Sequence, residues 1–575
     1  MKNFLLLFLS LTFTWALNAQ VIFSGESPAS IQGAYSMTYT DPGGGWGSPD
    51  LIDPANSVLD TLVRFYDNTA GDSLGCFGAV NGNDVDGHIA VIYRGECEFG
   101  DKAKNAQDAG AIACVIINNE PGGPVAMGAG AEGGNVTIPV VMIGDIDGAT
   151  LIDEMESNPV EVFIGNKTGF YANDIGTLKG RYLTAEYSST PSLLAQDDTE
   201  YEVVLGAWIY NYGFQDQTNV NLEATIDFGG NEIYNEISTS VDTILAGDSA
   251  FFALPDFSQP AYPEGFYELQ YVVFSDSTDD YDFDDTINTS FVISEDKISY
   301  ASFDEATMLP NSSGGVRPSE SDSYHACINF RNENASRIAV EGITFSAVKS
   351  NDANDPSIDG EPFNISVYEY NDQFTDVNDP NYSNPISSVN EIGFGSFQMP
   401  GDIPGEPVTA MFDEPVLLED NQRYLFCTST FNENVFIGSD PSMDYTLNQA
   451  EYLQPLFPIQ GGSWNPNGFG PNSVTVVTAN IVDVAEVSLK KEKLAIEMNA
   501  YPSPASNVLN IDFNGYDVDD VQLVNLTGQT VASQRVSKGD VNSSIDVNGL
   551  ENGVYIVKVN LTNGMTETMQ VVVSH

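Results

Sequence analysis

Positive charge is scarce in this sequence. Lysine and arginine together number 20 of 575 residues, against 82 aspartates and glutamates, which gives a formal net charge of −62. Nucleic acids and anionic membranes bind to cationic surfaces, so neither is an expected partner of this chain. The acidic residues are spread along the whole sequence, so the negative charge belongs to the entire surface rather than to one tail.

Histidine is rarer still, because the chain holds only His88, His325 and His575. No H-E-x-x-H motif is present, and His575 is the last residue of the sequence. Zinc peptidases hold their metal mainly with histidines at such short spacings. The sequence therefore argues against a conventional histidine-based zinc site.

Long apolar runs are missing beyond the first twenty residues. There, Lys2 precedes an apolar stretch at 4–17, and small or neutral residues follow up to Ala19. This order is typical of a secretory signal peptide, and the stretch is short for a membrane span. We expect residues 1–19 to be a signal peptide and the mature protein to carry no membrane span.

Cysteine is also sparse, and an odd count of five leaves one thiol unpaired. The oxidising compartment that a signal peptide implies permits disulfides. Cys114 lies within an apolar run and is expected to be a buried thiol. Cys76 and Cys97 flank a strand-like segment and could pair, and Cys327 and Cys427 fall in one later region and could also pair.

The stretch 21–167 carries mixed helix and strand signals. Short apolar runs typical of buried strands occur at 89–93, 111–117 and 138–143. Helix-forming composition occurs at 101–109, before a glycine, and at 147–157. A strand, a helix and a strand within about thirty residues predict a parallel βαβ unit with a right-handed crossover.

From about Gly169 onward the helical signal disappears and alternating apolar and polar segments follow, separated by turn residues. This pattern is typical of antiparallel β-sandwiches. We expect an immunoglobulin-like sandwich over 168–296 and a jelly-roll-like sandwich over 297–482. Residues 483–497, which include three clustered lysines, are expected to form a linker or a surface strand. A small C-terminal β-sandwich over 498–575 completes a multidomain, mostly β fold.

The stretch 87–153 resembles the protease-associated (PA) domain. The matching residues are GHIAVIYRGECEFGDKAKNAQDAGAIACVIINNE, followed by IPVVMI and a helix. The resemblance implies that 21–167 is an α/β PA domain, which serves peptidases and receptors as a binding or regulatory module and is not itself catalytic. In some relatives an upstream cysteine pairs with the cysteine after Arg-Gly, which implies a Cys76–Cys97 disulfide here.

The stretch 499–573 resembles the type A sorting domain of type IX secretion. The matching residues are NAYPSPASNVLNIDF, VQLVNLTGQTV and IDVNGLENGVYIVKV. Ser503 stands where the family usually has asparagine. The resemblance implies export by the type IX secretion machinery to the medium or the outer cell surface. It assigns the sorting motif to Tyr501, Pro502, Pro504, Gly553 and Tyr555.

One short sequence matches a motif of serine hydrolases. Residues 71–75 match G-x-S-x-G around Ser73, and His325 ends a D-x-x-H. A nucleophile elbow needs a strand before the serine and a helix after it. Here a loop follows Ser73, and Ser73 and His325 lie in different predicted domains. We interpret Ser73 as a surface-loop residue, and the enzymatic alternative is a hydrolase with an unrecognised site in 297–482.

Two acidic loops are candidates for binding calcium, the one cofactor that the sequence suggests. The stretch 276–285 holds six aspartates, and 351–361 mixes aspartate, asparagine and glycine. Hard oxygen ligands on loops suit Ca²⁺, although neither loop has the EF-hand spacing. We favour solvated acidic loops, with a calcium-dependent adhesin as an alternative. The candidate ligands are Asp276, Asp279, Asp280 and Asp282.

Two tryptophans lie in glycine-rich segments, Trp46 and Trp464. Either could stack on a sugar, but we expect both to anchor their loops. The sequence as a whole predicts a secreted or cell-surface, non-catalytic protein. Its predicted partners are the type IX secretion machinery and an unknown protein or peptide bound by the PA domain.

Overall fold

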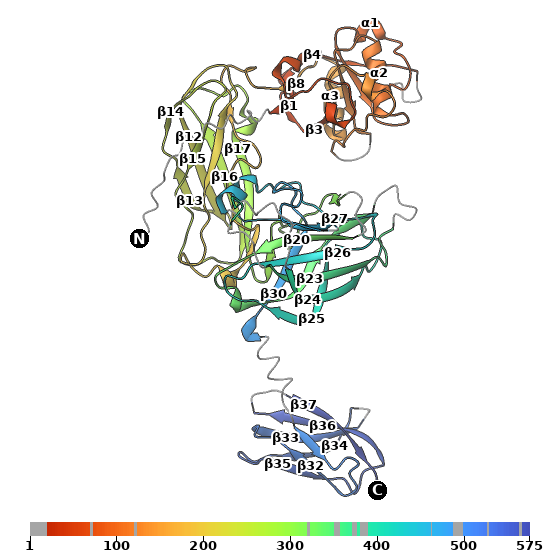
Figure 1. Cartoon of the computed structure of the whole chain (residues 1–575), viewed down its shortest axis with the longest axis vertical. Coiled ribbons are helices and arrows are strands. Elements are labelled where there is room, and N and C mark those ends of the chain that lie inside the picture. Colours follow the sequence, from red (N-terminus) through yellow and green to blue (C-terminus); the bar gives the residue numbers. More distant parts are fainter. Residues whose placement is uncertain are drawn as a thin grey trace.

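The computed structural model describes residues 20–68, 73–119, 123–318, 323–349, 357–370, 376–379, 389–452, 454–461, 463–486, 498–525, 528–562 and 566–575. In chain order it contains an α/β part, two β-sandwiches and a small C-terminal β part (Figure 1). The predicted fold class, multidomain and mostly β, is confirmed.

The α/β part is built on an eight-stranded sheet with the order β2-β1-β8-β4-β5-β6-β7-β3. The neighbours from β4 to β7 pair in parallel, as the predicted βαβ unit requires. The strands are β1 (Val21–Ser27), β2 (Gly33–Tyr35), β3 (Met37–Tyr39), β4 (Val58–Arg64), β5 (Ile89–Tyr93), β6 (Ala113–Ile117), β7 (Val140–Ile143) and β8 (Glu161–Asn166).

Helices cover both faces of this sheet. Ala103 and Ala106 of α2 (Phe99–Asp108) are fully buried against one face, and Leu151 of α3 (Asp145–Met155) packs in the core on the other. A short helix, α1 (Gly82–Val85), precedes β5. After α2, the backbone of Gly110 has a φ of +91°, which favours glycine, so the helix ends where the sequence predicted.

The first sandwich packs two sheets, β13-β12-β16-β17-β10 and β15-β11-β9, with β14 beside β12. Alternate residues of β12 point into its core, as the period of two predicts. The strands are β9 (Ile175–Gly176), β10 (Ser189–Pro191), β11 (Gly206–Asn211), β12 (Gln217–Phe228), β13 (Asn231–Ile237), β14 (Val241–Ile244), β15 (Ser249–Ala253), β16 (Gly265–Phe274) and β17 (Thr286–Ser294).

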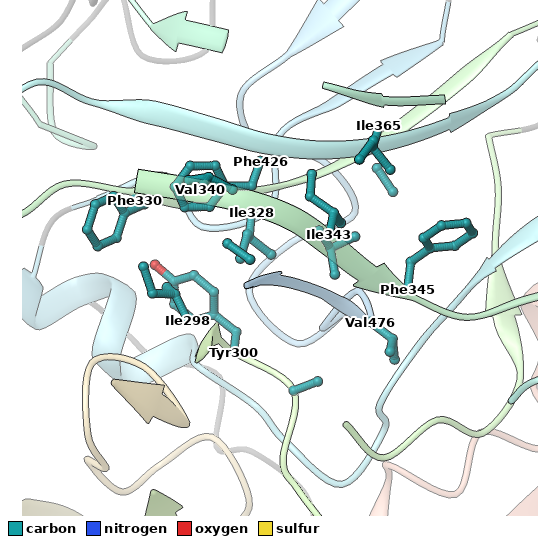
Figure 2. Close-up of a cluster of buried hydrophobic side chains, with 14 of the residues drawn as sticks. Ile298, Tyr300, Ile328, Phe330, Val340, Ile343, Phe345, Ile365, Phe426 and Val476 are labelled. Carbon is teal, nitrogen blue, oxygen red and sulfur yellow. The ribbon is translucent and has the colours of Figure 1, made fainter. Parts of the chain in front are cut away.

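The second sandwich encloses the largest core of the described residues, part of which Figure 2 shows around Ile328, Val340 and Phe426. Its six-stranded sheet has the order β24-β23-β26-β20-β28-β29. The elements are β18 (Lys297–Ser299), β19 (Gly315–Val316), β20 (Tyr324–Phe330), β21 (Ile338–Phe345), β22 (Ala347–Lys349), β23 (Pro362–Tyr370), β24 (Val389–Gln398), β25 (Val408–Leu417), β26 (Tyr424–Thr430), β27 (Val435–Gly438), α4 (Thr446–Tyr452), β28 (Ile459–Gly461), β29 (Ser463–Asn465) and β30 (Val477–Asp483).

One sheet runs through both sandwiches. Strand β10 pairs with β17 on one side and with β18 on the other, and β18 pairs with β30. The resulting ten-stranded sheet continues through β21 to β25. The two sandwiches predicted to meet at 296–297 are therefore hydrogen-bonded into one unit. Helix α4 is also a departure from the prediction of strands alone after Gly169.

The C-terminal part has its own core, which includes Leu509, Leu523 and Val557. Its two sheets have the orders β31-β32-β35 and β34-β33-β36-β37. The strands are β31 (Asn499–Tyr501), β32 (Val508–Asp512), β33 (Val518–Asn525), β34 (Thr530–Arg535), β35 (Asn542–Asp546), β36 (Gly553–Leu561) and β37 (Thr566–Val573).

Both proposed cysteine pairs form disulfides, Cys76–Cys97 and Cys327–Cys427, and Cys114 is a buried free thiol. The predicted signal peptide, residues 1–19, and residues 487–497 of the predicted linker lie outside the described residues. Among the described helices, none combines the length and the apolar character that crossing a bilayer requires.

Candidate functional site

Two adjoining hollows lie on the α/β part, on either side of the segment 78–86. The first, of about 750 Å³, lies between this segment and the end of α2. The second, of about 350 Å³, lies between the end of β4 and the end of α3. Asn81 and Asp84 line both hollows, so the two are neighbours.

The side chain of Asn81 fixes this segment to β4. Its amide nitrogen donates to the carbonyl of Arg64 at 2.9 Å, and its amide oxygen accepts from the N–H of Tyr66 at 3.0 Å. The N–H of Val80 donates to the carbonyl of Tyr66 at 2.8 Å. The carboxamide of Asn81 thus makes the hydrogen bonds to Arg64 and Tyr66 that a neighbouring strand would otherwise make.

Ser73 is buried rather than exposed in a surface loop, which corrects the sequence interpretation. The Nε of Arg64 donates to its hydroxyl at 2.9 Å. The same guanidinium lies over the rings of Tyr66 and Tyr93, at 5.6 Å and 5.7 Å from their centroids. A serine that accepts from an arginine in a closed site is not positioned as a nucleophile.

Lys102 of α2 is fully buried, which the sequence analysis did not predict. Its amine donates to the carbonyl of Leu74 and, at 2.6 Å, to that of Gly95, and it lies 3.8 Å from the sulfur of Cys76. Burial lowers the pKa of Lys102 to about 8, although nearby charges oppose the shift. The lysine therefore ties together the two loops that the Cys76–Cys97 disulfide also joins.

The three histidines lie in three different parts of the fold. His88 contacts Asp60 in the α/β part, with Nδ1 at 2.6 Å from Oδ1. His325 lies beside the ring of Trp464 in the second sandwich, and burial lowers its pKa. His575 lies 2.9 Å from the carbonyl of Leu550 in the C-terminal part. Ser73 and His325 therefore belong to separate domains.

The calcium candidates lie on one loop between β16 and β17. Three of them accept hydrogen bonds within the chain: Asp276 from Asn219, Asp279 from the N–H groups of Ile175 and Tyr281, and Asp280 from the N–H of Asn173. Asp282 is exposed. Across the described ranges, no three His, Cys, Asp or Glu side chains are arranged to hold a metal. Calcium binding by this loop stays an untested alternative to the solvated loop that we favoured.

The same loop encloses a buried lysine at the junction of the α/β part and the first sandwich. Lys167 places Nζ 2.7 Å from Oδ1 of Asp174 and 2.8 Å from Oδ2 of Asp284. Its ammonium also lies over the rings of Tyr212 and Tyr281. Part of the acidic stretch therefore has a structural partner. Nothing in the sequence around Lys167 distinguishes it from a surface lysine.

The two tryptophans differ in their surroundings. Trp46 is buried, its Nε1 donates to the carbonyl of Met127 at 3.0 Å, and its ring lies against Gly133. It anchors the glycine-rich loop, as expected. Trp464 is half-buried on β29 and packs against His325 and Tyr368, with ring centroids 5.8 Å and 5.3 Å away.

The residues of the predicted sorting motif lie beside the last strand. Ser503, between the two motif prolines, accepts from the N–H of Val572 at 3.0 Å. Gly553, where β36 begins, pairs with Val573 of β37. The hydroxyl of Tyr555 donates to the carbonyl of Glu551 at 2.9 Å. Both halves of the motif therefore meet at β37, although its recognition by the secretion machinery stays a prediction.

Comparison with protein families identifies one domain in the N-terminal part of the chain and one in the C-terminal part. Residues 59–151 match the PA domain. The chain contains a PA domain. Residues 499–574 match the secretion system C-terminal sorting domain, so the chain also ends in a sorting domain. This domain implies contact with the type IX secretion machinery and a secreted or cell-surface location.

Curated relatives share only part of their length with this chain. Aminopeptidase YwaD of Bacillus subtilis is 38% identical over 116 residues, which are 19% of this chain and 25% of that protein. The ER degradation-enhancing alpha-mannosidase-like protein 3 of Homo sapiens is 34% identical over 126 residues, 20% of this chain and 14% of that protein. The chain therefore spans a quarter or less of these relatives.

Among solved structures, an aminopeptidase from Aneurinibacillus sp. strain AM-1 is similar over 26% of this chain and 30% of its own. Its sequence identity is 23% and the TM-score is 0.20.

Proposed function

We propose that this protein is a secreted or cell-surface binding protein whose PA domain holds a protein or peptide without cleaving it. The observation that carries the proposal is the pair of adjoining hollows beside the segment 78–86, the second of which reaches the end of β4. A ligand there would contact strand backbone, the fixed carboxamide of Asn81 and the end of α3. Concave sites with a few oriented polar groups are the usual form of a binding site.

The structural use of the reactive side chains supports a non-catalytic PA domain. Ser73 is buried and accepts from Arg64, and the amine of Lys102 is enclosed by carbonyl groups. General acid–base or nucleophilic catalysis needs such groups within reach of a substrate and of each other. Several curated relatives are aminopeptidases. We infer that this chain shares with them the binding module, and that any peptidase is a separate molecule.

The continuous sheet supports a presenting role for the sandwiches. Because β10 and β18 join the two sandwiches by hydrogen bonds, the sandwiches form one base beside the PA domain. The buried Lys167 then connects the PA domain to that base. A binding module on such a base, exported by a sorting domain, suits capture of a ligand outside the cell.

Photo-crosslinking tests this proposal. The chain 20–575 is incubated with a random peptide library that carries a photoreactive group, irradiated, and digested for mass spectrometry. We expect most crosslinks within 59–151 and unbound peptides of unchanged mass, and competition by unlabelled library serves as the control. Crosslinks concentrated in 297–482, or shortened peptides, would overturn the proposal in favour of a hydrolase or another site.

A further inference from the structure

Within the described ranges, no strand pairs with the last residues of β4 on the side of β8, and this part of β4 is called its open edge. Strand β8 pairs with β4 only through residues 58–61 of β4. The last bond between the two segments runs from the N–H of Leu62 to the carbonyl of Val160, at 2.8 Å. Beyond it lies the hollow of about 350 Å³, which Leu62, Val63 and Arg64 line.

The alternation of a parallel ladder shows which backbone groups face this opening. The N–H of Phe65 donates to Val91 of β5, so Val63 and Phe65 turn their backbone groups toward β5. Leu62 and Arg64 turn theirs to the other side. There the Asn81 amide already holds the Arg64 carbonyl. Among the described residues, the Leu62 carbonyl and the Arg64 N–H have no hydrogen-bond partner, and both residues line the hollow.

The hollow has an apolar side and an acidic rim. Ile152 and Met155 of α3 line it beside Leu62, and Asp84 and Glu156 complete the lining with exposed carboxylates. Alternate side chains of an extended peptide could therefore rest on apolar atoms while the others reach carboxylates.

The charge around the two hollows favours a cation. The first hollow adds Asp86 and Asp108, and Asp108 already pairs with Lys104. Arg64 is the one cation that lines either hollow among the described residues, and its guanidinium is held by Ser73 and two tyrosine rings. Within the described part of the chain, Asp84, Asp86 and Glu156 form no ion pair. A second copy of this chain, at −62, would be repelled.

We propose that the open edge of β4 receives an extended peptide rich in lysine or arginine, which adds to the sheet as a strand beside Leu62–Arg64. Main-chain hydrogen bonds hold the peptide, and its cationic side chains meet Asp84 and Glu156. The inference rests on the proposed function and deepens it, because it names the ligand class and the mode of binding.

Fluorescence anisotropy with synthetic octapeptides tests it on the chain 20–575. We expect a peptide alternating lysine and valine to bind at least tenfold more tightly than one alternating glutamate and valine. The double variant D84N/E156Q should weaken binding of the lysine peptide about three- to tenfold and flatten its salt dependence, because rim charges act through screened attraction. The matched control, D227N/E268Q on the first sandwich, removes two acidic side chains at a distance and should change nothing.

Backbone methylation tests the strand addition separately. One lysine–valine peptide carries N-methyl groups on all its odd residues, and a second carries them on all its even residues. Since odd and even residues direct their N–H groups to opposite edges of a strand, only one of the two peptides has N-methyl groups on the edge that would pair with β4. We expect one peptide to lose binding and the other to keep it. Equal binding of both, or of the lysine and glutamate peptides, would overturn this inference even if library crosslinks still fall within 59–151. Crosslinks elsewhere would overturn the proposed function itself.

Discussion

Lys167 and Asp284, 117 residues apart in sequence, form a buried ion pair with Nζ 2.8 Å from Oδ2. Lys167 directly follows β8 of the PA domain, and Asp284 precedes β17 of the first sandwich. The aromatic rings of Phe163, Tyr171 and Tyr281 pack around the same junction. Lys167 and these rings together therefore hold the PA domain against the first sandwich.

Replacing this lysine should loosen the junction. Lys167→Met leaves Asp174 and Asp284 buried without their cation, and breaking a buried pair in this way costs about 3–5 kcal/mol. Urea unfolding followed by fluorescence measures the loss. Lys104→Met is the matched control, because its i,i+4 pair with Asp108 lies at the surface and contributes only about 0.3–0.5 kcal/mol. Equal effects of both variants would contradict the structural role of Lys167.

The junction should weaken as the pH rises. Burial raises the pKa of Asp174 to about 7 and that of Asp285 to about 8, and it also raises those of Asp279 and Asp284. The same carboxyl groups titrate near pH 4 when unfolded, so between about pH 4 and 8 the folded state binds more protons. The contribution of these carboxyl groups to the stability of the folded state is therefore fully present at acid pH and is lost as the pH approaches 8.

Hydrogen exchange around the junction at pH 6 and pH 8, corrected for the intrinsic rate, measures this change. We expect faster opening of residues 167–176 at pH 8. Asp285→Asn should reduce the difference, since the amide cannot ionise. A junction that opens more readily at pH 6 would contradict the assignment.

Thiol counting should find one hidden cysteine. Cys114 is fully buried, and burial raises its pKa to about 12, so both access and ionisation protect it. With Cys76–Cys97 and Cys327–Cys427 paired, a maleimide should label no cysteine in the folded protein and one after unfolding without reductant. Reductant should raise the number to five. Three labelled thiols without reductant would mean that one disulfide is absent.

Export should depend on the sorting domain. Deleting residues 498–575 removes the region that matches it and leaves the described core of the sandwiches complete. We expect immunoblots of the producing bacterium to find the shortened protein in the periplasm and the full chain in the medium or on the surface. Equal export of both forms would contradict the role of this domain.

The parts of the fold that were predictable from sequence are those with strong local patterns. Strand β5 spans Ile89–Tyr93 as expected, because a strand that is buried on both faces has a continuous run of apolar residues. Helix α4 was missed because its seven residues carry no apolar stripe. Its buried residue is Asn448, which donates to the carbonyl of Thr184, 264 residues earlier. No local pattern can reveal such a contact.

The candidate site was only partly predictable for the same reason. The resemblance over 87–153 located the PA domain, which the family comparison confirms over 59–151. The open edge of β4 was not foreseen, because it depends on where β8 stops pairing. Lys102 and Lys167 were missed because lysines are almost never fully buried unless paired, and their partners come from other segments.

Binding without cleavage is measured most directly by two readouts on one sample. The fluorescent lysine–valine octapeptide is mixed with increasing amounts of the chain 20–575, and its anisotropy and its mass are followed for a day. We predict a saturable rise in anisotropy, shifted to about three- to tenfold higher protein concentration in D84N/E156Q, and a peptide of unchanged mass throughout. A peptide that is shortened would contradict a PA domain that binds without cutting, and an anisotropy that does not rise would contradict binding of a lysine-rich peptide at the edge of β4.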